Sequence, residues 1–293
     1  MGDVTIPRHF TPADPEYPAR LRALTPPPAA VTIRGSLPEA KTVAIVGTRR
    51  PIPVAATFAR DLAGALARSG VIVVSGGALG IDTAAHEGAL RAGGRTWVVA
   101  GTGHGVQYPK ENGPLFDRVV AGGGALLFPF PPSTGGHPSR FLRRNAVLVA
   151  LADVLVIVQA RIPSGALNAA SWARRQEKPR WVVCPAPWDA ADPDFAGCQL
   201  ERRLGASALT SIDDFLRALE LPPKAGLGAV FQPRNPTEAR VFASLSVEPR
   251  HAEEVGLQCG LPYPEVMTAL LTLGLEDVLV EGPEGFFRRK QSP

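Results

Sequence analysis

The chain of 293 residues is 45% hydrophobic and 20% charged, a composition typical of a folded protein and not of a disordered one. Its longest apolar stretch, residues 147–158, is interrupted by Asp153 and is too short to cross a bilayer, so we expect a cytoplasmic protein without a membrane segment. Cys184, Cys198 and Cys259 lie far apart without metal-ligand spacing, which favours reduced thiols over disulfides or a metal site.

Short apolar runs alternate with helical patterns through residues 41–220. Such runs are typical of parallel strands buried on both faces, and their alternation with helices implies right-handed crossovers. We therefore predict an α/β fold: an extended Rossmann-like, doubly wound and mostly parallel sheet, with residues 1–40 as an N-terminal extension that packs on it. The predicted strands are residues 43–46, 71–74, 96–100, 125–128, 154–159 and 180–184, and the predicted helices are residues 54–68, 82–91, 114–120, 139–151, 164–176 and 211–219, the last preceded by a short piece at residues 198–205.

The last part of the chain predicts a small second domain. Residues 221–236 are rich in proline and glycine, as expected of a linker. In residues 237–293 we predict three helices, the first capped by Thr237, and then a hairpin around Gly282 and Pro283. Three helices and a hairpin in so short a segment are typical of a winged helix-turn-helix domain.

Charge is divided unevenly between the two predicted domains. Residues 236–293 carry 5 Lys and Arg against 9 Asp and Glu, whereas residues 1–235 carry 26 against 18. The larger domain is therefore basic, which indicates that it is the one to bind a polyanion. A genomic bias toward arginine explains the same counts equally well, so the motifs must decide.

Three glycine-containing turns directly follow predicted strands, and a fourth turn opens a predicted helix. In open α/β folds, ligands bind in the crevice at the carboxyl ends of the strands. Glycine allows the backbone to approach an anion closely, and a helix N-terminus offers unpaired N–H groups. We therefore predict a phosphate site with a floor of backbone amides. Its residues are Gly47, Thr48 and Arg49, then Ser75, Gly76 and Gly77, then Gly101, Thr102 and Gly103, and finally Ser164 and Gly165.

A basic segment with one aromatic residue opens the predicted helix 139–151. It contains Arg140, Phe141, Arg143, Arg144 and Asn145. Arginine binds backbone phosphates, and a phenylalanine face stacks a base for about 1–3 kcal/mol. The structural alternative is a solvated basic helix face with the aromatic ring in the core. The sequence favours contact with nucleic acid.

The other motifs give little support to catalysis. The turn at residues 101–105 lacks the spacing of a dinucleotide fingerprint, and the sequence has no P-loop. No catalytic triad, carboxylate pair or metal-ligating cluster has suitable spacing, so we expect a protein without enzymatic activity, cofactor or metal. Asp82 is interpreted as a cap of the following helix, and His86 as a hydrogen-bonding support residue in it.

Taken in order, these motifs resemble those of the DprA/Smf family. The resemblance covers residues 17–219 and rests on Gly47-Thr48-Arg49, residues 75–90, Gly101-Thr102-Gly103, Arg144-Asn145 and residues 164–167. It implies a Rossmann-type domain that binds single-stranded DNA, forms a homodimer, protects incoming DNA and loads the RecA recombinase in natural transformation. It implies no enzymatic activity, and a C-terminal winged helix is typical of the family.

The chain departs from this family pattern at two positions that carry arginine there. They are Leu79, in the segment after Ser75, and Ala146, directly after Asn145; Arg140 and Arg143 are candidates to replace one of the lost charges. These losses leave a second hypothesis open, in which the crevice holds a free nucleotide, as in nucleotide sensors or nucleoside-monophosphate hydrolases of the same fold superfamily. The acidic winged helix is expected to contact protein and not duplex DNA, because phosphate neutralisation dominates duplex binding.

Overall fold

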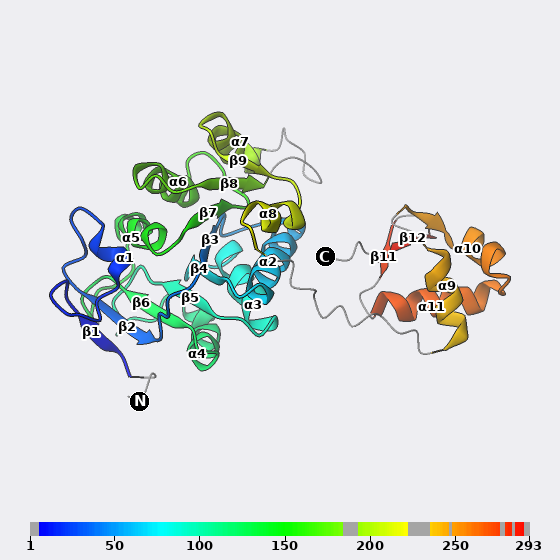
Figure 1. The fold of residues 1–293 in the computed structure, drawn as a ribbon, viewed down its shortest axis with the longest axis horizontal. Coiled ribbons are helices and arrows are strands. Elements are labelled where there is room, and N and C mark those ends of the chain that lie inside the picture. Colours follow the sequence, from blue (N-terminus) through cyan, green and yellow to red (C-terminus); the bar gives the residue numbers. More distant parts are fainter. Residues whose placement is uncertain are drawn as a thin grey trace. The chain divides into compact units, whose positions relative to one another are not determined.

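The computed structural model describes residues 6–183, 193–221, 235–245, 248–275, 279–282 and 285–289. The chain forms two compact units, residues 1–224 and 225–293 (Figure 1). Residues 222–234 of the predicted linker lie outside the described residues, as does Cys184. Among the helices that are described, none is both long and apolar enough to span a membrane.

The first unit is built on a nine-stranded sheet with the strand order β1-β2-β6-β5-β4-β3-β7-β8-β9. The strands from β3 to β9 are all parallel to one another. The chain proceeds from β3 toward β6 on one side and then continues with β7 on the other side of β3, so the topological switch point lies between β3 and β7. The parallel strands are β3 (Thr42–Val46), β4 (Ile72–Gly76), β5 (Thr96–Val99), β6 (Ala125–Phe128), β7 (Val154–Ile157), β8 (Arg180–Val183) and β9 (Ser207–Leu209).

Helices cover both faces of this sheet, as Figure 1 shows. One group packs α2 against α3 and α3 against α4, and the other packs α5 against α1 and α6. Gly88 permits the closest of these contacts, since a Cβ there would lie 2.1 Å from the carbonyl oxygen of Arg60. The helices are α1 (Ala19–Arg22), α2 (Pro53–Arg68), α3 (Ile81–Arg91), α4 (Gly113–Ala121), α5 (Pro138–Ala150), α6 (Gly165–Arg175), α7 (Ala196–Arg203) and α8 (Ile212–Ala218), with short 3₁₀ turns at Lys110–Asn112 and Pro193–Phe195.

The predicted fold class is confirmed, and each strand and helix predicted in residues 41–220 has a counterpart in the structure. The apolar runs form buried strands because both faces of the sheet are covered: all five residues of β3 are buried. The helix expected to start at Ser211 does so, since the Ser211 hydroxyl accepts a hydrogen bond from the Asp214 N–H at 3.1 Å.

The N-terminal extension contributes two strands that the sequence analysis did not predict. β1 (Arg8–Phe10) and β2 (Val31–Gly35) are antiparallel, and β2 pairs with β6, also antiparallel. Arg20 of α1 fixes the segment between them by an ion pair with Asp153 at 2.9 Å. The extension is therefore an integral edge of the sheet and does not simply pack on its surface.

The described residues of the second unit form three helices and a three-stranded antiparallel sheet in the order β10-β12-β11. The three helices and the β11–β12 hairpin agree with the predicted winged helix, and β10 is a further strand that was not predicted. Its core contains Val241, Val255, Leu270 and Phe287. The prediction that Thr237 caps the first helix is wrong. Asn235 is the cap, because its side-chain oxygen accepts a hydrogen bond from the Glu238 N–H at 2.8 Å. The elements are α9 (Pro236–Ser244), β10 (Arg250–His251), α10 (Ala252–Cys259), α11 (Tyr263–Leu275), β11 (Leu279–Glu281) and β12 (Phe286–Arg289).

Candidate nucleic-acid interface

The turn after β3 lies at the topological switch point, where β3 and β7 end side by side. The Thr48 N–H donates to the Gln159 carbonyl at 2.8 Å, and the Gln159 side-chain oxygen accepts from the Ile52 N–H at 3.1 Å. Gly47 is required here, because a Cβ would lie 2.6 Å from the Ile81 side chain. The turn is thus rigidly held, and it leaves Arg49 exposed at the edge of the sheet.

Arg49 and two aromatic rings form a cluster above the strand ends. The Arg49 guanidinium lies over the Phe141 ring, 5.2 Å from its centroid, and the Tyr108 ring lies 5.3 Å from the same centroid. Phe141 reaches this position because the β5 turn has a glycine beneath it: a Cβ on Gly101 would lie 2.2 Å from the ring. The cluster brings a cation and two aromatic surfaces together from three separate segments of the chain.

The turn after β4 is internal and does not form part of an exposed floor. The Ser75 hydroxyl donates to the Ile45 carbonyl at 2.6 Å, and Ser75 is completely buried. Gly76 and Gly77 are also buried: a Cβ on Gly76 would meet Arg144 and Asp82, and one on Gly77 would meet Phe116. These three residues therefore support the site from below, and the prediction that they touch phosphate does not fit their burial.

Arg144, predicted to bind phosphate, is only 6% exposed. Its Nη1 donates to the Val99 carbonyl, and its Nε has no hydrogen-bond partner among the described residues. Burial lowers its pKa, and the nearby Asp82 carboxylate opposes that shift. Arg144 is therefore a structural cation that joins α5 to the ends of β4 and β5, and the prediction of a direct phosphate contact is corrected accordingly.

Asp82 and His86 hold the first turns of α3 beneath the site. Asp82 is 7% exposed, and its carboxylate accepts a hydrogen bond from the Ala78 N–H at 3.3 Å. Burial raises the pKa of this carboxyl group, and the positive charge of Arg144 opposes part of that rise. Asp82 is not the N-cap, since Gly80 occupies that position with φ +87°. His86 is the predicted support residue, completely buried and 2.7 Å from both the Gly76 carbonyl and the Thr96 hydroxyl.

The turn after β5 is likewise closed by its own hydrogen bonds. The Thr102 hydroxyl donates to the Val106 carbonyl at 2.8 Å, and the Gly103 N–H donates to the Thr134 carbonyl at 2.9 Å. A Cβ on Gly103 would lie 1.9 Å from the Pro131 carbonyl oxygen, so glycine is required for this close packing. The Gly103 amide is therefore not available to an anion, contrary to the prediction.

The N-terminus of α6 lies beside α5, because Asn145 of α5 forms hydrogen bonds with residues of α6. The buried Asn145 side chain donates to the Gly165 carbonyl at 3.1 Å and to the Asn168 side chain at 3.0 Å. Ser164 caps the helix by accepting from the Leu167 N–H at 3.3 Å, and Gly165 is exposed. Asn145 is thus a link between two helices, whereas the α6 N-terminus faces solvent.

The remaining arginines of the predicted segment lie near the surface of α5. Arg140 is half-buried and donates to the Gly135 carbonyl at 2.8 Å. Arg143 is exposed and has no hydrogen bond or ion pair with any residue that the structure describes. Both line a groove of about 890 Å³ together with Arg144 and Ala146. Of the predicted site residues, Arg49, Arg143 and Gly165 are thus exposed, and Gly47, Thr48, Arg140, Phe141 and Ser164 are half-buried. Tyr108 is added because it contacts Phe141.

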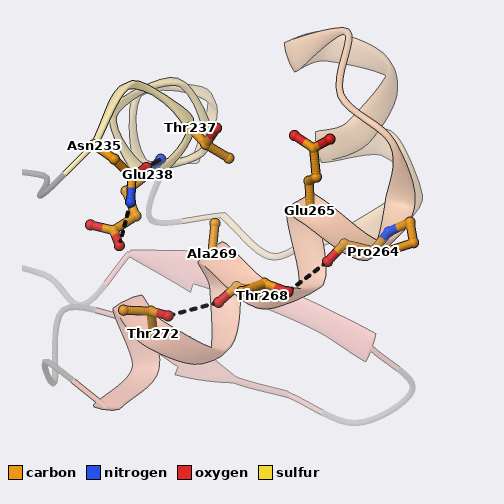
Figure 2. Close-up of a pocket in the computed structure, with 8 residues that line it drawn as sticks. All are labelled: Asn235, Thr237, Glu238, Pro264, Glu265, Thr268, Ala269 and Thr272. Carbon is orange, nitrogen blue, oxygen red and sulfur yellow. Dashed lines mark hydrogen bonds between the residues drawn. The ribbon is translucent and has the colours of Figure 1, made fainter.

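The second unit has a hollow of about 350 Å³ between α9 and α11 (Figure 2). Hydroxyl and carboxylate side chains line it, and none of its described lining residues is basic. On α11, the Thr268 hydroxyl donates to the Pro264 carbonyl at 2.8 Å, and the Thr272 hydroxyl donates to the Thr268 carbonyl at 2.9 Å. This surface is poorly suited to phosphate. The described lining residues are Asn235, Thr237, Glu238, Pro264, Glu265, Thr268, Ala269 and Thr272.

Two family models and several curated proteins match this chain. Residues 8–220 match the model of DNA recombination-mediator protein A, and residues 229–285 match that of the DprA winged helix domain. Protein Smf of Escherichia coli is 30% identical over 97% of this chain and 78% of its own length. A putative DNA processing protein DprA of Mycobacterium tuberculosis is 39% identical over 60% of this chain, a match that spans only 44% of that relative.

Two solved structures show the same fold. DNA processing protein A of Streptococcus pneumoniae is 29% identical with a TM-score of 0.66, covering 73% of this chain and 75% of its own. DNA processing protein A of Helicobacter pylori, described with its single-stranded DNA binding mode, is 30% identical with a TM-score of 0.63, covering 73% of this chain and 96% of its own. With a family model matching most of its length, this chain belongs to the DNA recombination-mediator protein A family, also named DprA or Smf.

Proposed function

We propose that this chain binds single-stranded DNA at the carboxyl ends of β3 and β5. The observation that carries the proposal is the exposed Arg49 guanidinium above the Phe141 ring at the topological switch point. An arginine binds a backbone phosphate of any sequence, and an adjacent aromatic ring stacks a base of any kind. The single-stranded DNA binding mode described for the Helicobacter pylori relative supports the same ligand here.

The buried residues around this cluster explain how it is held ready for a strand. Gly101 seats the Phe141 ring, and the Gln159 contacts fix the turn that carries Arg49. Because these contacts fix both groups in place, binding costs little ordering of the site. Arg143 and the exposed N-terminus of α6 at Gly165 add positive potential at the same edge of the sheet.

The biological role that follows is a proposal at the level of the family. The protein protects an incoming single strand and loads RecA recombinase onto it in natural transformation, acting in the cytoplasm as a homodimer. Family membership supports this role, and the absence of a recognisable catalytic motif in the sequence supports a binding protein and not an enzyme. The winged helix, which is acidic in composition and whose hollow has no basic residue among its described lining, then serves contacts with protein.

Fluorescence anisotropy of a labelled oligothymidylate across a salt series tests this function. Arg49→Ala is expected to weaken binding and to reduce the salt dependence by about 0.7, the value for one phosphate contact on a single strand. Phe141→Ala is expected to weaken binding while leaving the salt dependence nearly unchanged, because stacking releases no counterion. Arg217→Ala, which removes an arginine with a 71% exposed side chain from α8, is the matched control.

Absence of oligothymidylate binding at low salt would overturn the proposed function. Thermal stabilisation by a free nucleotide at micromolar concentration, without strand binding, would instead establish the rival hypothesis of a nucleotide sensor.

A further inference from the structure

A groove of about 890 Å³ lies beside the Arg49–Phe141–Tyr108 cluster, in the first unit. Its walls are the N-terminal segment 24–32, the segment 128–134 that follows β6, and the first turns of α5, with Trp172 of α6 also contributing to the lining. Pockets of about 300–1,000 Å³ hold whole small-molecule ligands, so the groove has room for nucleotides.

The chemistry of the lining is that of a surface for a nucleic acid strand. Of the described residues that line it, three are arginines and one is a histidine, and none carries a carboxylate; Arg144 is buried, which leaves Arg140 and Arg143 for phosphate contacts. The rest are mainly prolines, alanines and aromatic residues. Trp172 repeats the pairing found at the cluster, since the exposed Arg175 guanidinium lies 5.0 Å from the centroid of its ring. Arginines beside apolar and aromatic surfaces provide phosphate contacts and stacking together.

Helix α5 separates the groove from the cluster. Arg140, Arg143, Arg144 and Val147 follow one another at helical i, i+3, i+4 and i+7 spacing and line the groove, whereas Phe141 contacts Gly101 and Arg49 on the other side. Arg143 is exposed and has no hydrogen bond or ion pair among the described residues. A strand that passes from the cluster into the groove therefore meets this cation in the groove lining.

We propose that the groove is a second subsite for the same single strand, binding the nucleotides next to those held at Arg49 and Phe141. This inference rests on the proposed function. A free nucleotide offers the same phosphate and base, so the two sources have to be separated by experiment.

A pair of substitutions at Ala29 tests the subsite. Ala29 is exposed and lines the groove wall opposite α5, outside the cluster. Ala29→Glu places a carboxylate in the groove, and Ala29→Gln is its uncharged match. Ala218→Glu on α8 makes the same change of net charge at an exposed position outside the groove lining. Binding is measured by anisotropy with oligothymidylates of about 4 to about 16 nucleotides, the range of site sizes known for single-strand-binding folds.

With the longer oligonucleotides, Ala29→Glu is expected to bind about threefold to tenfold more weakly than Ala29→Gln, as one added charge near a phosphate predicts. With the shortest oligonucleotide that still binds, the two variants are expected to be equal, because that strand does not reach the groove. Arg49→Ala is expected to weaken binding at every length.

Equal affinity of the two Ala29 variants at all lengths, with Arg49→Ala still impaired, would overturn the subsite and leave the proposed function intact. Loss of thymidine monophosphate binding in Ala29→Glu, with oligothymidylate binding unchanged, would assign the groove to a free nucleotide and also overturn it. Failure of the unmodified protein to bind any oligothymidylate would overturn the proposed function itself.

Discussion

His86 makes the stability of the first unit depend on pH. The imidazole is completely buried, and burial lowers its pKa to about 4 from 6.5, an effect that the hydrogen bond to the Gly76 carbonyl partly opposes. At a pH between these two pKa values, the His86 side chain is mostly protonated in the unfolded chain and mostly neutral in the folded chain. The contribution of His86 to stability is therefore complete above a pH of about 6.5 and is lost as the pH falls toward 4.

The size of the effect follows from the pKa shift. Each unit corresponds to about 1.4 kcal/mol, so the complete shift corresponds to about 3 kcal/mol. Between pH of about 7.5 and about 5 the expected loss is about 2 kcal/mol, because at the lower pH most of the unfolded chains already carry the proton while few folded ones do. That is a large part of the stability of a typical domain, which is about 5–15 kcal/mol.

Urea unfolding followed by tryptophan fluorescence measures this loss. Trp97, Trp172, Trp181 and Trp188 all belong to residues 1–224, so the signal reports on the first unit alone. The His86→Gln variant keeps a side-chain N–H for hydrogen bonding but lacks the titrating group. Its free energy of unfolding is expected to fall by about 2 kcal/mol less than that of the unmodified protein between the two pH values.

His104→Gln is the control for this experiment, because it makes the same substitution at an exposed histidine of the first unit. The raised pKa of Asp82 acts in the opposite direction, but it is present in all three proteins and cancels in the comparison. Equal losses in the unmodified protein and His86→Gln would refute the reasoning from burial.

Three further substitutions test the site. Gly101→Ala places a Cβ 2.2 Å from Phe141 and must displace that ring, so oligothymidylate binding measured by anisotropy is expected to weaken as much as in Phe141→Ala. Ala146→Arg adds a cation to the groove lining, and the salt dependence of binding to a long oligothymidylate is expected to increase by about 0.7. Arg144→Met leaves the buried Asp82 without its neighbouring cation, and urea unfolding is expected to show a loss of about 3–5 kcal/mol; a loss below 1 kcal/mol would contradict the structural role of Arg144.

Local sequence patterns determined most of the fold. The apolar runs and the helical periods between them predicted the parallel strands and their helices, since a strand buried on both faces has to be apolar along its whole length. β1 and β2 could not be predicted in this way. They are short, antiparallel and separated by a proline-rich segment, and β2 becomes a strand because β6 offers it an unpaired edge.

The candidate site was only partly encoded in local sequence. The sequence placed Arg49, Phe141 and the glycine turns at one edge of the sheet, because the carboxyl ends of parallel strands always meet there. It did not distinguish Arg143 from Arg144, which are adjacent on α5 and chemically identical. Only the tertiary structure decided that one faces solvent and the other is 6% exposed, since residues adjacent on a helix point about 100° apart and the packing of α5 on the sheet selects which one is buried.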